Sequence, residues 1–568
     1  MVAADGKTAG GNSAYHNFNN DFAHIKDVNA RRRLALAEVD AAPFGWYHVR
    51  AITVAGVGFF TDSYDIFTVS LLTLMLGIVY FPGVGHMPTT SDTAIKLATS
   101  AGTVIGQVGF GALADIVGRK QMYGLELIFV IFATVAQALT SNSPSMNIIG
   151  IIIFWRVLMG IGIGGDYPLS SVITSEFATT KWRGAMMGAV FAMQGFGQLA
   201  AAFVMLFLTL GFKSQLEPAL TLAECTGSCA VAVDRMWRCL IGFGAIPGCI
   251  ALYYRLTIPE TPRYTFDVKF DVEKAGADTE AYLEGKSEGK PDAVAQAIVK
   301  KEAEKKMEVE KASWSDFFKV YLGKRKNAML LAGCALSWCF LDIAYYGVSL
   351  NNAVILDVIG YSTKNAKNVY EILYNTAIGN MIIVLAGAVP GYWVTVFTVD
   401  TLGRKPIQFM GFGILTVLFV VMGFAYDKLS SNALLAIFVL AQFFFNFGPN
   451  ATTFIVPGEC FPTRYRSTSH GISAAMGKIG SIIGQGAIAP LRTRGAYPGN
   501  PNPWMDHVLK IYALFMLLGI GTTAMIIETK RKTLEELTEE GWEEGETADS
   551  VSEGPVASGA NGNGSESK

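Results

Sequence analysis

Long apolar runs recur along this 568-residue chain, separated by short polar or glycine-rich stretches. Leu97 to Ala114, Pro406 to Tyr426 and Ala433 to Gly458 contain no charged residue. As helices, runs of this kind cross about 30 Å of hydrocarbon. A soluble protein with buried helices would need polar helix faces, which these runs lack. The pattern therefore predicts an all-α integral membrane protein.

Counting such runs predicts twelve transmembrane helices. They cover roughly residues 49–79, 93–114, 121–140, 147–173, 184–211, 236–257, 327–352, 369–398, 406–426, 432–458, 468–490 and 507–527. Composition agrees with a membrane location, because 51% of the residues are hydrophobic and only 16% are charged. Soluble domains are typically about one quarter charged.

Charge in the connecting segments predicts the orientation. Residues 1–48 are polar and contain no apolar core of a signal peptide, so we expect the N-terminus in the cytosol. An even number of spans then places the C-terminus there too. The expected inside loops carry most of the basic residues, as the positive-inside rule requires. Expected outside loops break that rule near four residues: Lys364, Lys367, Arg492 and Arg494.

The spans divide the chain into five segments. These are a cytosolic N-terminal segment (1–48), a first six-helix half (49–257), a charged cytosolic linker (258–326), a second six-helix half (327–527) and an acidic, mostly disordered cytosolic tail (528–568). Cys225 and Cys229 fall in an expected outside loop where a disulfide could survive, and whether they pair is left open.

An internal repeat relates the two halves. DIVGRK begins at Asp115 in the first half and DTLGRK at Asp400 in the second, and PETPR (259–263) has a weaker counterpart in ETKRK (528–532). Glu176 precedes Arg183 by seven residues, as Glu459 precedes Arg466. Matched signals at nearly constant spacing predict homologous halves. This plan resembles major facilitator transporters, in which substrate binds between the halves near the bilayer midplane.

The repeated charges suggest a gate on the cytosolic side. Acid and arginine at helix ends can tie neighbouring helices together. The alternative, for either copy alone, is that these loops only set topology. The gating candidates are Asp115, Arg119, Asp400, Arg404, Glu176, Arg183, Glu459 and Arg466.

Ionisable residues within the apolar spans are candidates for function. A charge facing lipid costs at least about 2.5 kcal/mol, so such residues should face the bundle interior. A structural ion pair is the alternative for each. These candidates are Asp62, Asp65, Arg156, Asp166, Asp342 and Lys478. Glu126 is expected to be structural, and His470 to be structural or modulatory.

Three stretches carry a family resemblance. GGDYPLSSVITSEFATTKWRG (164–184), AGVGFFTDSYDIF (55–67) and FNFGPNATTFIVPGECFPTRYRSTSHGISAAMGKIG (445–480) resemble phosphate:proton symporters of the major facilitator superfamily, in the fungal high-affinity branch. The resemblance implies secondary active import of inorganic phosphate with protons through the plasma membrane. Its partners would be phosphate, protons and membrane lipid, with no nucleic acid, cofactor or metal.

The resemblance also implies site residues. Substrate contacts would be Tyr167, Gln194, Trp338, Asp342, Tyr346, an asparagine that is Asn446 or Asn450, and Lys478 near the anion. Asn446 is the favoured asparagine. The proton path would run through Asp62 and Asp166, with Asp65 nearby and Arg156 as the partner of Asp62.

Side-chain chemistry is compatible with an oxyanion substrate. Trp338, Asp342 and Tyr346 are spaced by four, so one helix face presents an indole N–H, a carboxylate and a phenol. A proton-coupled sugar or organic-ion symporter of the same fold, or a phosphate receptor with a signalling role, are the alternatives. An enzyme is disfavoured, because the sequence has no Walker loop, no HExxH and no metal-spaced Cys/His cluster.

Overall fold

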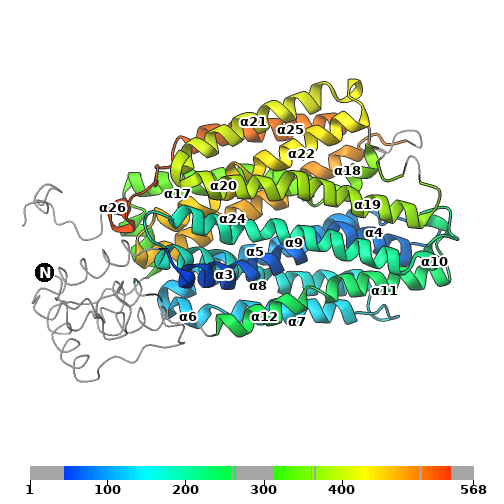
Figure 1. Cartoon of the computed structure of the whole chain (residues 1–568), viewed down its shortest axis with the longest axis horizontal. Helices are drawn as coiled ribbons and strands as arrows, with labels where there is room; N and C mark the ends of the chain where they lie inside the picture. The colour runs from blue at the N-terminus through cyan, green and yellow to red at the C-terminus, as the bar shows by residue number, and fades with distance from the viewer. Residues whose placement is uncertain are drawn as a thin grey trace, which may run out of the picture.

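A computed structural model provides the structure. It describes residues 44–256, 261, 263, 313–359, 361–363, 366–497 and 502–538. The polar N-terminal segment before residue 44, most of the expected linker and the tail beyond residue 538 therefore lie outside the described residues. Helices run along the long axis of the molecule and form one bundle (Figure 1).

Within the described residues, the first half contains eight long helices and three short ones. They are α3 (Trp46–Phe67), α4 (Val69–Tyr80), α5 (Thr89–Val117), α6 (Arg119–Met122), α7 (Leu125–Leu139), α8 (Ile148–Phe177), α9 (Arg183–Gly211), α10 (Lys213–Leu216), η1 (Leu222–Glu224), α11 (Ser228–Gly242) and α12 (Ala245–Arg255). Consecutive helices α3 and α4 form one span, as do α6 with α7 and α11 with α12.

The second half follows two short elements of the linker. Those are α16 (Trp314–Asp316) and η2 (Phe317–Tyr321). The half itself comprises α17 (Arg325–Ser349), α18 (Asn352–Val358), α19 (Val369–Ile383), η3 (Val384–Ala388), α20 (Val389–Leu402), α21 (Arg404–Phe424), η4 (Tyr426–Lys428), α22 (Ser431–Asn446), α23 (Pro449–Glu459), η5 (Thr463–Tyr465), α24 (Arg466–Ile483), η6 (Gly484–Ile488), η7 (Ala489–Thr493) and α25 (Met505–Thr523). A short helix, α26 (Leu534–Thr538), follows at the start of the tail.

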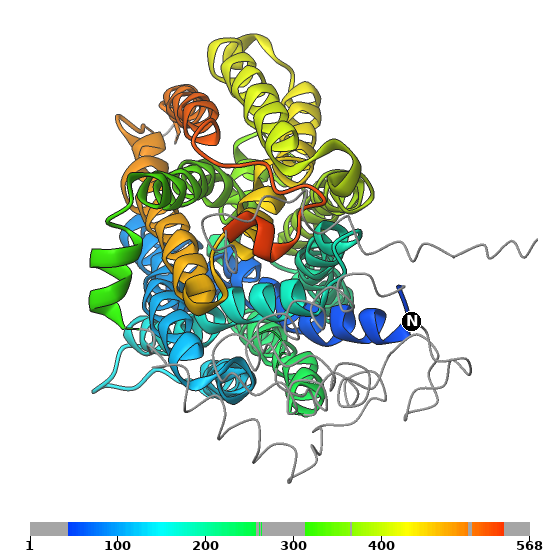
Figure 2. The same cartoon turned by 90° about the vertical axis from the view of Figure 1, so that its left-hand side faces the viewer.

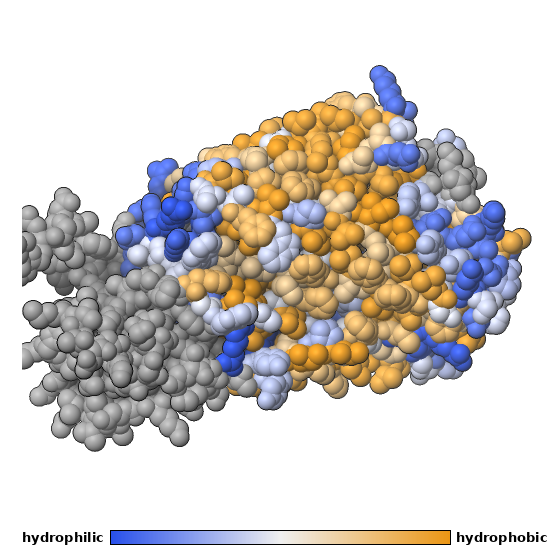
Figure 3. Space-filling model, in the orientation of Figure 1, coloured by the Kyte–Doolittle hydropathy of each residue, from blue (hydrophilic) through white to orange (hydrophobic). Residues whose placement is uncertain are grey.

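Within the described residues, eleven helices are long and apolar enough to cross a membrane, and each coincides with one of the predicted spans. The remaining predicted span, 468–490, coincides with α24 and η6. This span is less apolar than the other eleven because α24 carries serines, His470 and Lys478, which are all buried inside the bundle. An apolar belt surrounds the middle of the visible face, and polar surface gathers at both ends (Figure 3). This is the surface expected of a membrane protein.

The two halves lie side by side and meet along two helix pairs. Seen end-on, the elements before the linker occupy one side of the bundle and those after it the other (Figure 2). Helix α5 packs against α24, and α9 packs against α20. Closely packed helices within each half meet at small residues. Backbone carbonyls of α8 face Gly102 and Gly106, and those of α17 face Gly480 and Gly484.

Matched glycines end a helix in each half and show the repeat in the backbone. Gly118 ends α5 with φ 123°, and Gly403 ends α20 with φ 99°. Only glycine adopts such angles readily, so the Asp-x-x-Gly-Arg motif makes the same sharp turn twice. That turn places Arg119 and Arg404 at the start of the next helix in each half.

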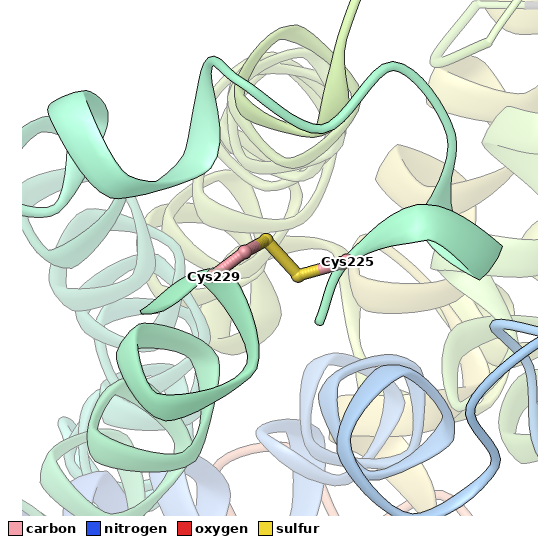
Figure 4. Close-up of a disulfide and its surroundings, with 2 residues drawn as sticks. All are labelled: Cys225 and Cys229. Atoms are coloured by element: carbon pink, nitrogen blue, oxygen red, sulfur yellow. A yellow bond between two sulfur atoms is a disulfide. The ribbon is translucent and has the colours of Figure 1, made fainter. Parts of the chain in front are cut away.

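The bundle has two distinguishable ends. We call the end that carries Arg119 and Arg404 the arginine end. The opposite end carries a disulfide between Cys225 and Cys229, with Cα atoms 5.2 Å apart, and is called the disulfide end. This bond joins the segment after η1 to the first turn of α11 (Figure 4). The pairing that the sequence left open is therefore formed.

Candidate functional site

At the arginine end, two aspartates hold the starts of helices from the opposite half. Asp115 accepts hydrogen bonds from the backbone N–H groups of Ser467 and Thr468, at 3.3 and 2.7 Å. In the second copy, Asp400 accepts from the N–H groups of Gly184 and Ala185, at 3.2 and 2.7 Å. A carboxylate at a helix N-terminus is stabilised by the helix dipole, so each contact ties the halves together.

Each aspartate is paired with the arginine of its own motif. The distance from Arg119 Nη2 to Asp115 Oδ1 is 3.2 Å, and that from Arg404 Nη1 to Asp400 Oδ1 is 2.7 Å. All four side chains are buried. Because two matched copies bind across the interface, this is more than a pair of basic loops that set topology.

Two glutamates complete the arginine end. Glu176 forms ion pairs with Arg119 at 3.4 Å and with Arg466 of the second half at 3.1 Å. Glu459 pairs with Arg404 at 2.7 Å. Arg183 donates to the backbone carbonyl of Lys532 at 2.9 Å. The eight predicted gating residues thus gather at this end of the bundle.

The third repeat motif reaches the same glutamates. Thr261 Oγ1 donates to Glu176 Oε2, and Thr529 Oγ1 donates to Glu459 Oε2, both at 2.5 Å. Thr261 and Thr529, which belong to the weakest match in the sequence, therefore make equivalent contacts with the two glutamates.

Near the middle of the bundle, Lys478 of α24 contacts three predicted site residues. Its Nζ donates to Asp342 Oδ2 at 3.1 Å and to Tyr346 OH at 2.8 Å. It also lies 5.0 Å from the ring centroid of Tyr167. Within the described residues, the second oxygen of Asp342 is buried without a hydrogen-bond partner. A lysine from the second half thus meets the first half through an aromatic ring.

A chain of hydrogen bonds continues from Tyr167 across the interface. Gln194 Nε2 donates to Tyr167 OH at 2.9 Å, and Tyr392 OH donates to Gln194 Oε1 at 3.2 Å. Asn450 Nδ2 donates to Tyr392 OH at 2.9 Å and to Asn446 Oδ1 at 2.7 Å. Both candidate asparagines therefore join the network, and Asn450 is linked to Gln194 through Tyr392.

Trp338 packs against one side of this hydrogen-bond network. Its ring centroid lies 6.3 Å from that of Tyr167 and 5.6 Å from that of His470. His470 Nε2 is 3.1 Å from the backbone carbonyl oxygen of Phe454, so the histidine sits behind the tryptophan in a supporting position. All eight predicted substrate residues are thus gathered at the interface of the halves.

In the first half, one arginine joins two buried carboxylates. Arg255, at the end of α12, donates to Asp166 at 2.7 Å and to Glu126 at 2.6 Å. Asp62 lies one turn after Gly58 on α3, and Gly58 faces Asp166 Oδ2 and Arg255 Nη2. Within the described residues, both carboxylate oxygens of Asp62 are buried without a hydrogen-bond partner. Glu126 and Asp166 therefore share a counter-ion, and Glu126, expected to be structural, belongs to the same cluster as two proton-path candidates.

The predicted pairing of Arg156 with Asp62 is wrong. Arg156 Nη2 donates to the backbone carbonyl of Asp65 at 3.4 Å, and the side chain of Asp65 accepts from Thr134 at 3.0 Å. Ten residues of helix separate Arg156 from Asp166, which is about 15 Å. Because Asp62 lies beside Asp166, the arginine reaches only the next turn of α3, where Asp65 lies.

Arg255 and Tyr392 are functional candidates that sequence reasoning missed. A cation at the end of a membrane span resembles an ordinary topology signal, so Arg255 did not stand out. Its only sequence signal was an unmatched buried acid, Glu126, in a neighbouring span. Tyr392 lies in an uncharged stretch of α20 and gave no signal.

Comparison with known sequences settles the family. Residues 51–540 match the family described as "Sugar (and other) transporter". The chain belongs to this transporter family. A repressible high-affinity phosphate permease of Neurospora crassa is 83% identical over 535 residues, covering 94% of both chains. An inorganic phosphate transporter of Saccharomyces cerevisiae is 56% identical, covering 94% of this chain and 91% of the relative.

Solved structures confirm the fold. A proton:xylose symporter of the major facilitator superfamily, bound to 6-bromo-6-deoxy-D-glucose, aligns with a TM-score of 0.65 at 18% identity, covering 86% of this chain and 98% of the symporter. The chain is thus an all-α membrane transporter with the major facilitator fold. Its sequence also resembles fungal phosphate transporters, as the motifs predicted.

Proposed function

We propose that this chain imports inorganic phosphate together with protons by alternating access. Its similarity to the Neurospora crassa permease and the Saccharomyces cerevisiae transporter supports phosphate as the substrate. In this proposal the arginine end and both termini face the cytosol, and the protein works in the plasma membrane. The concentration of arginine and lysine at that end favours the orientation.

The observation that carries the proposal is the Lys478–Asp342 pair at the interface of the halves. Lys478 supplies a positive charge for an oxyanion, and the hydroxyl groups of Tyr346 and Tyr167 supply donors beside it. Asp342 retains one buried oxygen without a partner within the described residues. A bound dihydrogen phosphate would donate an O–H group to that oxygen while its other oxygens accept.

This arrangement favours phosphate over sulfate. Dihydrogen phosphate both donates and accepts hydrogen bonds, so it satisfies Asp342 and Lys478 at once. Sulfate has no O–H group at neutral pH, so it would place an anion against a carboxylate with no proton between them. A site built around a specific hydrogen bond discriminates strongly against an analogue that lacks it.

The acid cluster around Arg255 provides the route for protons. Asp166 and Tyr167 are consecutive in α8, so the proton-binding and phosphate-binding groups lie on one helix. Protons taken up at Asp62 and Asp166 would reduce the negative charge beside the incoming anion. The loaded protein would then close at the disulfide end and open at the arginine end.

Uptake of labelled phosphate into vesicles containing the purified chain tests the proposal. We expect accumulation driven by an inward proton gradient, with no competition from sulfate or glucose. Uptake inhibited by glucose would favour a sugar symporter, and phosphate binding without flux would favour a receptor. An absence of any phosphate effect would overturn the proposed substrate.

A further inference from the structure

A second basic pocket lies between the central site and the disulfide end. It is narrow in this conformation and is bounded by α3, α4, α5, α8, α17 and α24. Lys96, Arg156 and Lys478 line it, together with the hydroxyl groups of Thr99 and Ser100. Ten of the described residues line the pocket. Three of them are cationic and none is acidic.

Polar groups in this pocket have unused hydrogen-bonding capacity. Within the described residues, Arg156 Nε and Thr99 Oγ1 are buried without a hydrogen-bond partner. Arg156 is 2% exposed, and its Nη2 donates a hydrogen bond to the backbone carbonyl of Asp65. Buried polar groups are normally paired, so unpartnered donors facing a cavity point to a ligand that accepts hydrogen bonds.

The pocket spans both halves and is continuous with the central site. Lys96 Nζ, from the first half, donates to Asn351 Oδ1 of the second half at 2.9 Å. Ser100 and Ser481 are joined across the same seam at 3.0 Å. Lys478 and Tyr346 line this pocket and also take part in the central network. An anion held here therefore lies next to the central site, on the side of Asp342 that faces the disulfide end.

Basic charge continues outward to the disulfide end. Arg492, one of the residues that break the positive-inside rule, lines a neighbouring pocket together with Asn351, which accepts the hydrogen bond from Lys96. Arg492 Nε is also buried without a partner among the described residues. Arg492, Lys96, Arg156 and Lys478 thus form a series of cations from this end to the centre, which we call the basic path. Asp92 is paired with Lys96 and Asp342 with Lys478, so four cations along the path face two acids. The excess of positive charge attracts an anion and accelerates its association.

We propose that the basic path contains a separate anion site, formed by Lys96, Arg156 and Thr99, that receives a tetrahedral oxyanion such as dihydrogen phosphate before the central site does. This inference rests on the proposed function for the direction of travel. Contacts of α5 with α24 close this site in the present structure, so it fills when the disulfide end opens. The basic residues near this end that break the positive-inside rule would then capture substrate, and they would not set the orientation of the protein in the membrane.

Lys96→Gln tests the site without touching the central network. Asp92 is its ion-pair partner at 2.8 Å, one turn earlier on α5. We expect the variant to raise the KM for phosphate uptake about tenfold, within the range of electrostatic attraction, with little change at saturating phosphate. Lys96→Arg should restore the wild-type KM. An unchanged KM in Lys96→Gln would overturn the proposal.

Two controls separate capture from folding and from local charge balance. Lys213→Gln removes an exposed lysine at the same end that is paired with Glu217 at 3.5 Å, again one turn away, and should leave the KM unchanged. The double variant Asp92→Asn/Lys96→Gln leaves no unpaired carboxylate and should keep the raised KM. If the double variant recovers wild-type uptake, Lys96 only neutralises Asp92 and the anion site is rejected.

The wild-type protein distinguishes failure of this site from failure of the proposed function. If wild-type vesicles take up no phosphate, the proposed function fails first. If they take up phosphate and Lys96→Gln behaves like wild type, the anion site alone is overturned. Raising ionic strength provides a further readout. Screening should raise the KM of wild type more than that of Lys96→Gln, and equal sensitivity contradicts the role of Lys96.

Discussion

Arg466 of the second half forms a buried ion pair with Glu176 of the first half, 3.1 Å apart. The same glutamate also binds Arg119 and accepts a hydrogen bond from Thr261. Glu176 therefore joins Arg119 of its own half, Thr261 just after that half and Arg466 of the other half. The arginine end cannot open without separating Arg466 from this glutamate.

Glu176→Gln should weaken the closed arginine end. The change leaves two buried arginines without a full counter-charge, and breaking a buried pair costs roughly 3–5 kcal/mol. We expect faster labelling of a cysteine introduced at that end, together with reduced uptake. Glu217→Gln, which removes an exposed acid at the opposite end, is the control. Unchanged labelling would show that Glu176 does not hold the closed state.

Asp115→Asn should lower transport while the protein remains in the membrane. An amide oxygen accepts from the N–H groups of Ser467 and Thr468 more weakly than a carboxylate does, and it forms no ion pair with Arg119. Uptake per molecule at the cell surface is the measurement. Because Asp400 makes the equivalent contacts, Asp400→Asn should give a loss of similar size. Normal uptake at normal surface abundance would contradict the gating role.

The internal repeat was the sequence feature that predicted the two-half architecture best, and the structure shows why the repeated residues recur. Asp115 and Asp400 recur because both must reach a helix start in the opposite half, which fixes residue type and spacing. Span prediction worked for the same kind of reason, since crossing hydrocarbon demands a continuous apolar run. The span containing Lys478 was recognised although its polar interior face lowers its apolar character.

Pairings between distant side chains were harder to predict. The carboxylates of Asp62 and Asp65 are one turn apart, and sequence alone could not show which of them faces Arg156. Arg255 escaped notice because its partners, Asp166 and Glu126, come from two other helices. Such contacts depend on helix rotation and on the axial offset between helices, which hydropathy does not report.

Asp342→Asn should weaken phosphate binding and relax discrimination against sulfate. The amide keeps the shape of the side chain but removes the charge that pairs with Lys478 at 3.1 Å. Losing a hydrogen bond to a charged group costs about 1.5–3 kcal/mol, which corresponds to roughly a ten- to hundredfold weaker affinity. Binding of labelled phosphate with sulfate as competitor measures both effects. Asp357→Asn, which changes an exposed acid on α18, is the control.

Preserved affinity and sulfate exclusion in Asp342→Asn would show that this carboxylate does not contact the substrate. A loss of affinity with sulfate still excluded would assign Asp342 to positioning Lys478 instead.

Asp166→Asn should abolish accumulation of phosphate against its gradient. Asparagine cannot take up and release a proton, so the first half would lose a proton carrier beside Tyr167. Exchange of phosphate between the two sides, which needs no net proton movement, should survive better than accumulation. Both are measured in vesicles with and without a pH difference. A variant that still concentrates phosphate with wild-type pH dependence would refute the assignment.

Arg255→Gln should destabilise the protein, because it leaves Asp166 and Glu126 buried without their shared cation. Removing one partner of a buried pair costs about 3–5 kcal/mol, so the melting temperature of the purified protein should fall. Arg255→Lys keeps one charge but lacks the planar fork that reaches both carboxylates, so it should recover only part of the loss. The triple variant Arg255→Gln/Asp166→Asn/Glu126→Gln removes the arginine together with both of its carboxylate partners and should regain stability without regaining accumulation. Recovery of accumulation in that triple variant would show that proton coupling needs none of Arg255, Asp166 and Glu126.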